Sequence, residues 1–349
     1  MAGIKSYAQN DPDFLGGAAS CAPITSLTCA DDDEIHPLPG KEYTYTVGTD
    51  GVTDIATVHW FVVNATATPN ILSGGYNFAT VSAIAEANGG TSLFLLNAES
   101  HYNTQSANPS IKISWQAFNA STTDILLVAY VEGDNCADNI EAWKIEPSFS
   151  FALDIAGLMP NGTLPASGNA NECVSDIHSA SYDGSELTMD YGFNYVFFTV
   201  TATNFVHSWM PELTAVVNGS SSTVSSIEWA YQANAQTTGA WNSSTTAVVA
   251  QNSLNAVGDA GECIIVRVLV DHNNVENDTP SSVTLTVNGV MYDVTAANYT
   301  NTVAYSDLDN PETAGDPCRV GSFDVATYDI TPRPSVIPVN PTDLFIGKN

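Results

Sequence analysis

The chain has 349 residues, of which 38 are acidic and 8 are basic, and its formal net charge at pH 7 is −30. Such a surface repels nucleic acids and anionic membranes, which excludes both as partners, and it leaves divalent cations, cationic partners and neutral glycans as ligand classes. Only 13% of the residues are charged, about half the share in a typical domain. Acidity also keeps an exposed protein soluble, and that is the plainer explanation of the charge.

The first residues resemble the end of an export signal. Ser6-Tyr7-Ala8 before Gln9 has the small-x-small pattern of a secretory cleavage site, which predicts cleavage after Ala8. The charged and apolar parts of a signal are missing before it, so either the true start lies upstream of Met1 or the match is accidental. We expect the former. No apolar run is long enough for a transmembrane helix.

Most of the chain has the pattern of β-strands. Nearly every apolar run is short, rich in β-branched or aromatic residues and bounded by Gly, Asn, Asp or Pro, and many such strands at regular spacing are typical of β-sandwiches. Good helix formers are scarce outside 81–88, where one or two helical turns are expected. The predicted strands are Tyr43–Val47, Ala56–Val63, Ser92–Leu96, Ile111–Ala117, Ile125–Glu132, Ala142–Ile145, Ser148–Ile155, Ile177–Tyr182, Glu186–Tyr191, Val196–Ala202, Leu213–Val217, Ser226–Ala233, Ala247–Gln251, Cys263–Asp271, Ser282–Val287 and Val290–Thr295.

A weak internal repeat divides the chain. Pro109–Ala117 resembles Ser225–Ala233, and downstream of each copy an apolar strand ends in an acidic, Asn-rich turn, at Gly133–Asn139 and at Asp271–Asp278. The repeat predicts two sandwich modules. The predicted division is the end of a signal peptide at 1–8, an N-terminal arm at 9–35, module 1 at 36–156, a linker at 157–173, module 2 at 174–296 and a C-terminal extension at 297–349.

The strands of the first module resemble those of a known family. Gly40–Val47, Val58–Val62 and Ile111–Trp115, followed by Val128–Glu132 and Asn135-Cys136-Ala137, are similar to the PKD-like, immunoglobulin-like modules of secreted Bacteroidota cell-surface proteins. The resemblance is best over 36–146 and looser over the second module. It implies an all-β chain of tandem immunoglobulin-like (PKD-like) β-sandwich modules with extended termini. It also implies an extracellular or cell-surface place, and a structural, adhesive or polymer-forming role without a catalytic motif.

Six cysteines are spread along the chain, and none is part of a CxxC pair, which argues against zinc-ribbon and thioredoxin sites. An even number of dispersed cysteines predicts disulfides formed in an oxidising compartment. Cys21 with Cys29 is the simplest local bridge, and Cys136 is a candidate partner of Cys173, while buried free thiols are the alternative. The disulfide candidates are Cys21, Cys29, Cys136, Cys173, Cys263 and Cys318.

No catalytic motif is present in the sequence. The six histidines lack the spacing of a zinc enzyme, and there is no P-loop or G-x-S-x-G. His59 and His207, near tryptophans in strand-like patterns, are expected to be structural. The paired carboxylates of a glycosidase meet only in a folded protein, but no motif supports them. We therefore expect no enzyme and no cofactor other than calcium.

Calcium is the ligand that the acidic turns suit best, because hard cations bind carboxylate, amide and carbonyl oxygens. The segments are Asp31–Glu34, Asp271–Asp278 and Asp307–Asn310, and none matches an EF-hand loop. Solvated acidic turns are the plainer interpretation. The weak calcium candidates are Asp271, Asn273, Asp278, Asp307 and Asp309.

Aromatic side chains suggest a glycan ligand. Trp115, Trp229, Trp241 and Tyr231 would form a stacking platform if they lay on an exposed sheet face. Tryptophan in a sandwich is more often part of the core, and we favour that alternative.

These patterns predict a non-catalytic extracellular structural protein, a subunit of a bacterial surface filament, appendage or layer that forms a homo-oligomer or polymer. The tail 332–349 has four prolines among apolar residues, a composition that allows an extended edge strand, and such a strand can complete a neighbour's sheet. The alternative is a monomeric adhesin or a carbohydrate-binding surface protein.

Overall fold

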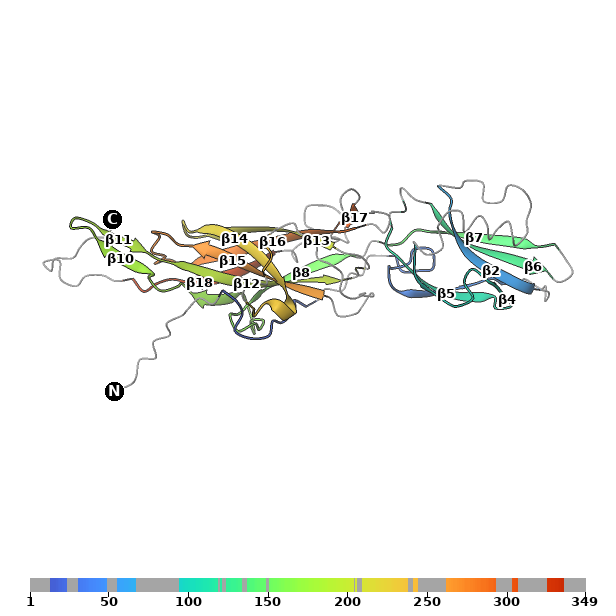
Figure 1. Ribbon diagram of the computed structural model, residues 1–349, viewed down its shortest axis with the longest axis horizontal. Helices are drawn as coiled ribbons and strands as arrows, with labels where there is room; N and C mark the ends of the chain where they lie inside the picture. Colours follow the sequence, from blue (N-terminus) through green and yellow to red (C-terminus); the bar gives the residue numbers. More distant parts are fainter. Residues whose placement is uncertain are drawn as a thin grey trace.

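The structure is a computed structural model, in which two groups of strands follow each other along the long axis of an elongated molecule (Figure 1). The residues that it describes contain no α-helix, and their one helical segment is a 3-10 turn at Gln232–Asn234. The prediction of an all-β chain is confirmed. The described residues are 13–23, 31–48, 55–66, 94–118, 120, 124–133, 137–148, 151–203, 205, 209–237, 241–243, 262–292, 303–306 and 325–335.

The first group of strands is a sandwich of two antiparallel sheets, which we call the first sandwich. One sheet has the order β1–β5–β3 and the other has the order β4–β2–β6–β7. Most of these strands lie within a residue or two of their predicted ranges. The strands are β1 Glu42–Thr46, β2 Ile55–Asn64, β3 Leu95–Ala98, β4 Gln105–Ser106, β5 Ser110–Trp115, β6 Ile125–Gly133 and β7 Asn139–Ile145.

Period-two alternation of the side chains builds the core of the first sandwich. In β1 exposed and buried residues alternate, so Tyr43 and Tyr45 face the opposing sheet. Trp115 Nε1 donates a hydrogen bond to the Tyr45 hydroxyl over 2.8 Å, which satisfies the buried indole N–H. Tyr45 also lies 6.3 Å from Trp143, between ring centroids, and Trp143 stacks on Trp60 at 5.6 Å. This aromatic chain connects the two sheets.

The second group, which we call the second sandwich, has the strand order of an immunoglobulin constant domain. One sheet has the order β14–β15–β12–β8, and the other has the order β13–β16–β18–β9 with β17 paired to β16. In that fold the sheets are ordered A-B-E-D and C-F-G, so β8, β12, β15 and β14 match the first and β13, β16 and β18 match the second. The immunoglobulin-like β-sandwich is thus confirmed. The strands are β8 Ala152–Leu158, β9 Ala170–Cys173, β12 Phe193–Thr203, β13 Trp209–Asn218, β14 Thr223–Tyr231, β15 Glu262–Asp271, β16 Ser281–Tyr292, β17 Val303–Ser306 and β18 Val325–Thr331.

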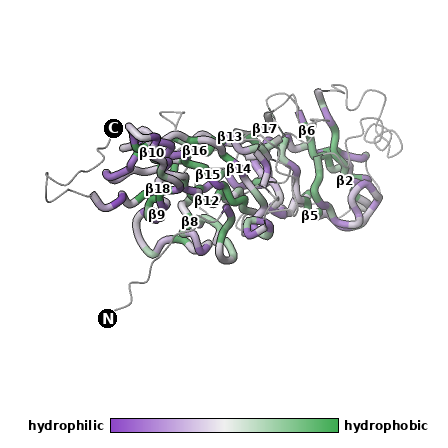
Figure 2. Tube along the Cα trace, turned by 60° about the vertical axis from the view of Figure 1, so that its left-hand side comes forward, coloured by the Kyte–Doolittle hydropathy of each residue, from purple (hydrophilic) through white to green (hydrophobic). Residues whose placement is uncertain are grey.

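The core of the second sandwich is made of fully buried side chains from both sheets. Phe198 and Val266 face it from one sheet, and Trp209 and Tyr328 face it from the other. Burial of each such side chain contributes about 2 kcal/mol. Figure 2 shows hydrophobic residues along the central strands and hydrophilic ones in the turns at the ends. A separate hairpin, formed by β10 Ser179–Tyr182 and β11 Leu187–Asp190, projects at the far end (Figure 1).

Strand pairing departs from the predicted module boundaries. β8 lies at the predicted end of module 1, at 36–156, but it pairs with β12 along its whole length. β9 lies in the predicted linker 157–173, and it pairs in parallel with β18 from the predicted extension 297–349. The second sandwich therefore uses residues on both sides of 174–296. The repeat could not reveal this, because pairing between distant strands leaves no local signal in a sequence.

Two predicted strands form a single strand, and a glycine within it packs closely against the opposing sheet. The predicted ranges 282–287 and 290–295 are joined in β16, although Asn288-Gly289 has the composition of a hairpin turn. A Cβ at Gly289 would lie 2.4 Å from Leu153 Cδ1, so the glycine permits close packing of β8 on β16. The predicted helix at 81–88 and strand at 247–251 lie outside the described residues.

Candidate functional site

The N-terminal arm, residues 13–23, packs on the outer face of the β14–β15–β12–β8 sheet. Leu15 and Ala19 are buried there against Phe197 and Ile265. Because Phe197 and Ile265 alternate with residues that face the core, this sheet is covered on both sides. The full cluster is Leu15, Ala19, Leu158, Phe197, Ala235, Cys263 and Ile265, with Cys21, Leu164, Tyr195 and Trp241 partly buried against it.

Hydrogen bonds hold the arm along its length. At its closest approach a Cβ on Gly17 would lie 2.3 Å from the carbonyl oxygen of Asn161, so only glycine fits against this loop. The bonds run from Leu15 N to Ala235 O (3.2 Å), from Gly16 N to Pro160 O (2.9 Å), from Ser20 N to Gly162 O (2.8 Å), from Gln232 Nε2 to Ala19 O (2.6 Å) and from Thr201 Oγ1 to Ala22 O (3.0 Å).

Arg267 of β15 clamps the start of the arm. Its Nε and Nη2 donate to the Glu228 carboxylate over 2.7 and 2.6 Å, and its Nη1 donates to the carbonyl of Asp13. The guanidinium lies over the rings of Tyr195 and Trp241, 4.8 and 4.3 Å from their centroids. A paired, partly buried arginine between two aromatic rings is rigid, so it holds the arm firmly at Asp13.

A disulfide between Cys21 and Cys263 fastens the other end of the arm to β15. The presence of an intramolecular disulfide agrees with the sequence, but the predicted Cys21–Cys29 pair is wrong, because Cys21 packs against a strand that is distant in sequence. The two cysteines are 242 residues apart, and in the chain-entropy model closing a loop of that length stabilises the fold by about 5 kcal/mol.

The remaining cysteines do not follow the predicted pairing. Cys173 is a free, exposed thiol at the end of β9, so the predicted Cys136–Cys173 bridge is not formed. Cys29, Cys136 and Cys318 lie outside the described residues.

The arm makes the first sandwich an insertion within the second. Residues 13–23 belong to the second sandwich, β1 to β7 form the first, and the chain returns to the second at β8. The predicted arm at 9–35 therefore divides, because residues near 35 contact the first sandwich: the Tyr45 hydroxyl donates to the Glu34 carbonyl over 2.5 Å. Two connections thus join the sandwiches in place of the predicted single linker.

The acidic turn at 271–278 is built around a buried histidine. His272 Nδ1 lies 2.7 Å from Asn277 Nδ2, and His272 Nε2 lies 2.7 Å from Asn194 Oδ1. An amide nitrogen only donates, so Nδ1 accepts, and the neutral ring carries its proton on Nε2. Asn194 Nδ2 donates in turn to Glu172 over 2.9 Å. The turn is a structural hydrogen-bond network that ties β15 to β12 and β9.

Burial lowers the pKa of His272 to about 4, and the positive charge of Arg333 adds to this effect, which the Asp271 carboxylate opposes. Arg333 is held in place by the carbonyls of Tyr191 (2.9 Å) and Glu276 (3.0 Å). The imidazole is therefore neutral at pH 7, in keeping with its role as an acceptor.

The three calcium candidates that the structure describes do not lie in one site. Asp271 and Asn273 line one hollow, whereas Asp278 lines a different one. Asp307 and Asp309 lie outside the described residues. Within the described ranges no three His, Cys, Asp or Glu side chains are placed to hold a metal ion.

The other acidic segment, Asp31–Glu34, anchors the first sandwich. Asp32 accepts hydrogen bonds from Lys41 Nζ and from the Tyr43 hydroxyl, and these bonds lower the pKa of Asp32. Asp33 Oδ1 accepts from the backbone N–H of His36 over 2.7 Å. These carboxylates are engaged in local structure.

The aromatic residues considered for a platform lie mostly in the interior. Trp115 and Trp229 are buried in the cores of the two sandwiches, which confirms the favoured expectation for them and excludes them from a platform. Trp241 lies over Arg267, and Tyr231 is partly buried beside Trp229, 5.5 Å away between ring centroids. Exposed rings are found instead near the β10–β11 hairpin, where Tyr182 is 54% and Phe193 is 44% exposed.

The histidine expected to be structural in the first sandwich is buried. His59 Nε2 lies 3.1 Å from Asn103 Oδ1, and burial lowers the pKa of His59. His207 lies outside the described residues.

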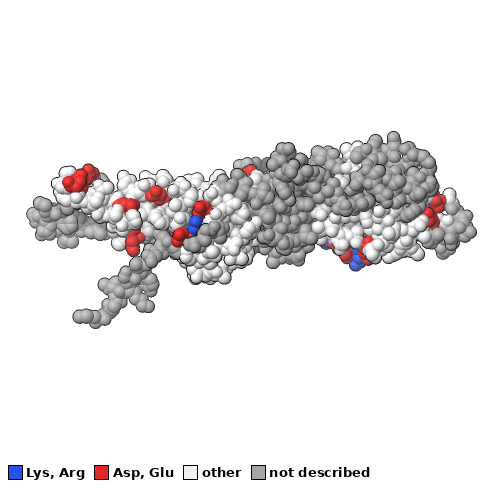
Figure 3. Space-filling model, in the orientation of Figure 1, with Lys and Arg blue, Asp and Glu red and all other residues white. Residues whose placement is uncertain are grey.

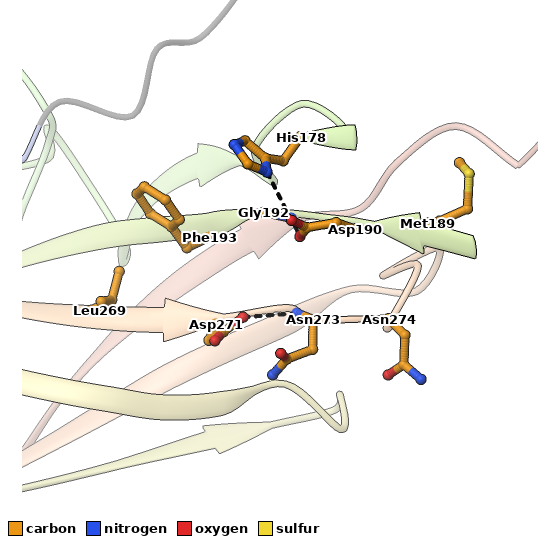
Figure 4. A pocket seen from close by; sticks show the side chains of 9 residues that line it. All are labelled: His178, Met189, Asp190, Gly192, Phe193, Leu269, Asp271, Asn273 and Asn274. Atoms are coloured by element: carbon orange, nitrogen blue, oxygen red, sulfur yellow. Dashed lines mark hydrogen bonds and ion pairs between the residues drawn. The ribbon is translucent and has the colours of Figure 1, made fainter. Parts of the chain in front are cut away.

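An open hollow of about 690 Å³ lies between the β10–β11 hairpin and the ends of β12 and β15. In Figure 4 Phe193 and Leu269 lie on one side of it, and Met189 and Asn274 lie on the other. Asp190 accepts hydrogen bonds from the Gly192 N–H (2.9 Å) and from His178 Nδ1 (2.8 Å), which lower the pKa of Asp190. The lining is completed by Asp271 and Asn273.

Acidic side chains dominate the charge near this end of the molecule. Over the second sandwich the face in Figure 3 shows more acidic than basic side chains, and the basic ones that are visible lie beside acidic ones. Among the described residues, lysine and arginine form the ion pairs Lys41–Asp32, Lys112–Glu42, Lys144–Asp124, Lys144–Glu146 and Arg267–Glu228.

Comparison with known proteins adds little to this description. The sequence matches no protein-family profile and no curated protein. Among solved structures, the cadherin-like domains 1 to 4 of zebrafish RET align with a TM-score of 0.21 and 9% identity, covering 79% of this chain and 41% of that chain. At this TM-score the likeness carries no argument about function. The described part of the chain has no helix with the length and hydropathy of a membrane span.

Proposed function

We propose that this chain is a non-catalytic structural protein of the bacterial cell surface, and that its copies assemble into a filament, appendage or layer by exchanging a terminal segment. The observation that carries the proposal is the packing of the N-terminal arm on the outer face of the second sandwich. Hydrogen bonds, apolar contacts and one disulfide hold the arm on the second sandwich. All these contacts would be the same if the arm came from a neighbouring copy, which is a low-cost route to assembly.

Several features support an extracellular place. The Cys21–Cys263 disulfide is of the kind that persists in oxidising compartments, and immunoglobulin-like sandwiches are common in cell-surface proteins. The strand motifs of the first sandwich support the finer proposal that it is a PKD-like module of secreted Bacteroidota surface proteins.

The C-terminal tail at 332–349 is the other donor to consider. β18, directly before it, fills the G position of its own sandwich, and the same position in a neighbour could receive it in an exchanged assembly. The two exchanges differ in one respect, because only the arm carries a cysteine that bonds to the body of the protein.

The disulfide therefore reports which exchange operates. We expect negative-stain images of native material to show polymers, and a denaturing gel without reductant to show a covalent ladder that reductant collapses. Cys21→Ser and Cys263→Ser should each abolish the ladder, while Cys173→Ser serves as the matched control and should retain it. Polymers without a ladder would indicate that the copies exchange the C-terminal segment and not the arm. Native material that is only monomeric would overturn the proposal, and turnover of a polysaccharide or peptide pool would contradict the non-catalytic part.

A further inference from the structure

We infer that the hollow beside the β10–β11 hairpin is a binding site for a neutral saccharide. This inference is independent of assembly, since a monomer would carry the same site. The hollow lies at the junction of the rigid β12–β15 pair with the hairpin, and it has a mixed polar and apolar lining. A concave surface with an apolar wall and a few convergent polar groups is the usual form of a small-ligand site.

Phe193 supplies the apolar wall. Its ring is 44% exposed although it is a large hydrophobic side chain, and Leu269 and Met189 line the hollow beside it. The ring contacts Tyr195 edge-on, with centroids 5.7 Å apart, and Tyr195 lies under Arg267. The contact with Tyr195 therefore holds the Phe193 ring in place, and the exposed part of the ring lines the hollow. The negative face of an aromatic ring attracts the weakly positive C–H groups of a pyranose.

The polar groups suit hydroxyls. Asp271 uses Oδ1 to accept a hydrogen bond from the Asn273 N–H (2.9 Å), and among the described residues no hydrogen bond engages its Oδ2 or the side-chain amides of Asn273 and Asn274. Asp271 can only accept, and each amide both donates and accepts. A sugar hydroxyl also does both, so neighbouring hydroxyls can satisfy this set together.

Charge and geometry disfavour the other ligand classes. The carboxylates of Asp190 and Asp271 repel sialic and uronic acids. Calcium and magnesium need about six or more oxygen ligands, but both oxygens of Asp190 already accept hydrogen bonds, from Gly192 and His178. A neutral sugar avoids the repulsion and does not compete for Asp190.

The full chain should be applied to an array of neutral oligosaccharides of glucose, xylose, mannose and N-acetylglucosamine, with sialylated and uronic acid-containing counterparts. We expect neutral saccharides to bind and the acidic ones to bind more weakly. In calorimetry with the strongest neutral saccharide, Phe193→Ala and Asp271→Asn should each weaken binding by about ten-fold. Asp271→Asn keeps an acceptor for the Asn273 N–H, so its fold should be unchanged.

Tyr182→Ala is the matched control, because it removes another exposed aromatic ring, from the β10–β11 hairpin, that does not line the hollow. It should bind like the unmodified protein, and thermal melts of all three variants should confirm that they fold. Absence of any bound neutral saccharide, equal binding of the acidic ones, or undiminished binding by Phe193→Ala would overturn the inference. None of these results would affect the polymer images, so the two proposals fail separately.

Discussion

His272 shows how burial decides the role of a single residue. In the sequence it stands in a turn rich in acids and amides, which suggested oxygen ligands for calcium. In the folded protein the amide of Asn277 instead bonds to the imidazole, and Asn194 continues the network to Glu172. The calcium candidates of this turn lie outside that network, and they line two different hollows.

We predict that the free energy of unfolding falls as the pH drops below 6.5 and that the loss due to His272 levels off near pH 4. Between these values the unfolded chain binds a proton at His272, whose ordinary pKa is 6.5, whereas the native chain, with a pKa of about 4, does not. Above pH 6.5 both states are neutral and the stabilisation is complete. The full loss is about 3 kcal/mol.

Urea denaturation at a pH of about 7.5 and of about 4.5 measures this loss. His272→Gln should be less stable at the higher pH and should lose less on acidification. A His272→Gln protein with the full pH dependence would contradict the prediction.

The local sequence pattern predicts which side chains of a strand share a face, but not whether that face is buried or exposed to solvent. Alternation in Glu42–Thr46 shows that Tyr43 and Tyr45 share a face, and the structure buries both. It does not distinguish Trp229, which is buried, from Phe193, which is exposed. Both residues lie in apolar strands, and what covers each of them comes from residues far away in the sequence.

At the scale of elements, strands were predictable but their partners were not. The strand predicted at Cys263–Asp271 is present as β15, and its continuous apolar run Ile264-Ile265-Val266 is buried on both faces. One face packs in the core and the other is covered by the arm. The sequence of the arm does not predict this packing, because residues 13–23 contain few large apolar side chains and no strand pattern. β18 was not predicted either. It lies beyond the internal repeat, so no matching strand of the first copy pointed to it.

Two truncations should separate the structural strand from the tail. A chain ending after Ser335 keeps β18 and the contacts of Arg333, so we expect its second sandwich to remain folded. A chain ending after Asp324 lacks β18, which pairs with both β16 and β9, and should leave open the part of the core that Tyr328 of β18 fills. Its unfolding midpoint should fall, or its second sandwich should not fold. Limited proteolysis and thermal melts measure the difference, and equal stability of the two chains would contradict the pairing.

At the scale of the whole molecule, charge opposes compactness. The acidic excess of 30 far exceeds what the few ion pairs compensate, so repulsion among the carboxylates outweighs the attraction within those pairs. Screening should therefore stabilise the protein although it weakens the pairs. We predict that the melting temperature rises when NaCl is increased from about 0.02 M to about 0.5 M. Differential scanning calorimetry tests this, and a fall in melting temperature would show that the pairs dominate.

Calcium provides the matched comparison for that experiment. CaCl₂ at equal ionic strength should act like NaCl if calcium only screens charge. A saturable extra stabilisation at low calcium concentration would instead reveal a specific site, for which Asp307 and Asp309 are the candidates outside the described residues.

The bond between Cys21 and Cys263 also determines how tension would travel through the molecule. A pull between the arm and β18 would pass from Cys21 straight into β15 and leave through the second sandwich. The first sandwich lies in the chain between the two cysteines, so it would carry none of the load. In an assembly joined by exchanged arms the path would differ, because Cys21 would be bonded to a neighbouring copy and the chain between the arm and β8 would connect the two copies. The first sandwich lies in that stretch of chain, so it would carry the load in every copy.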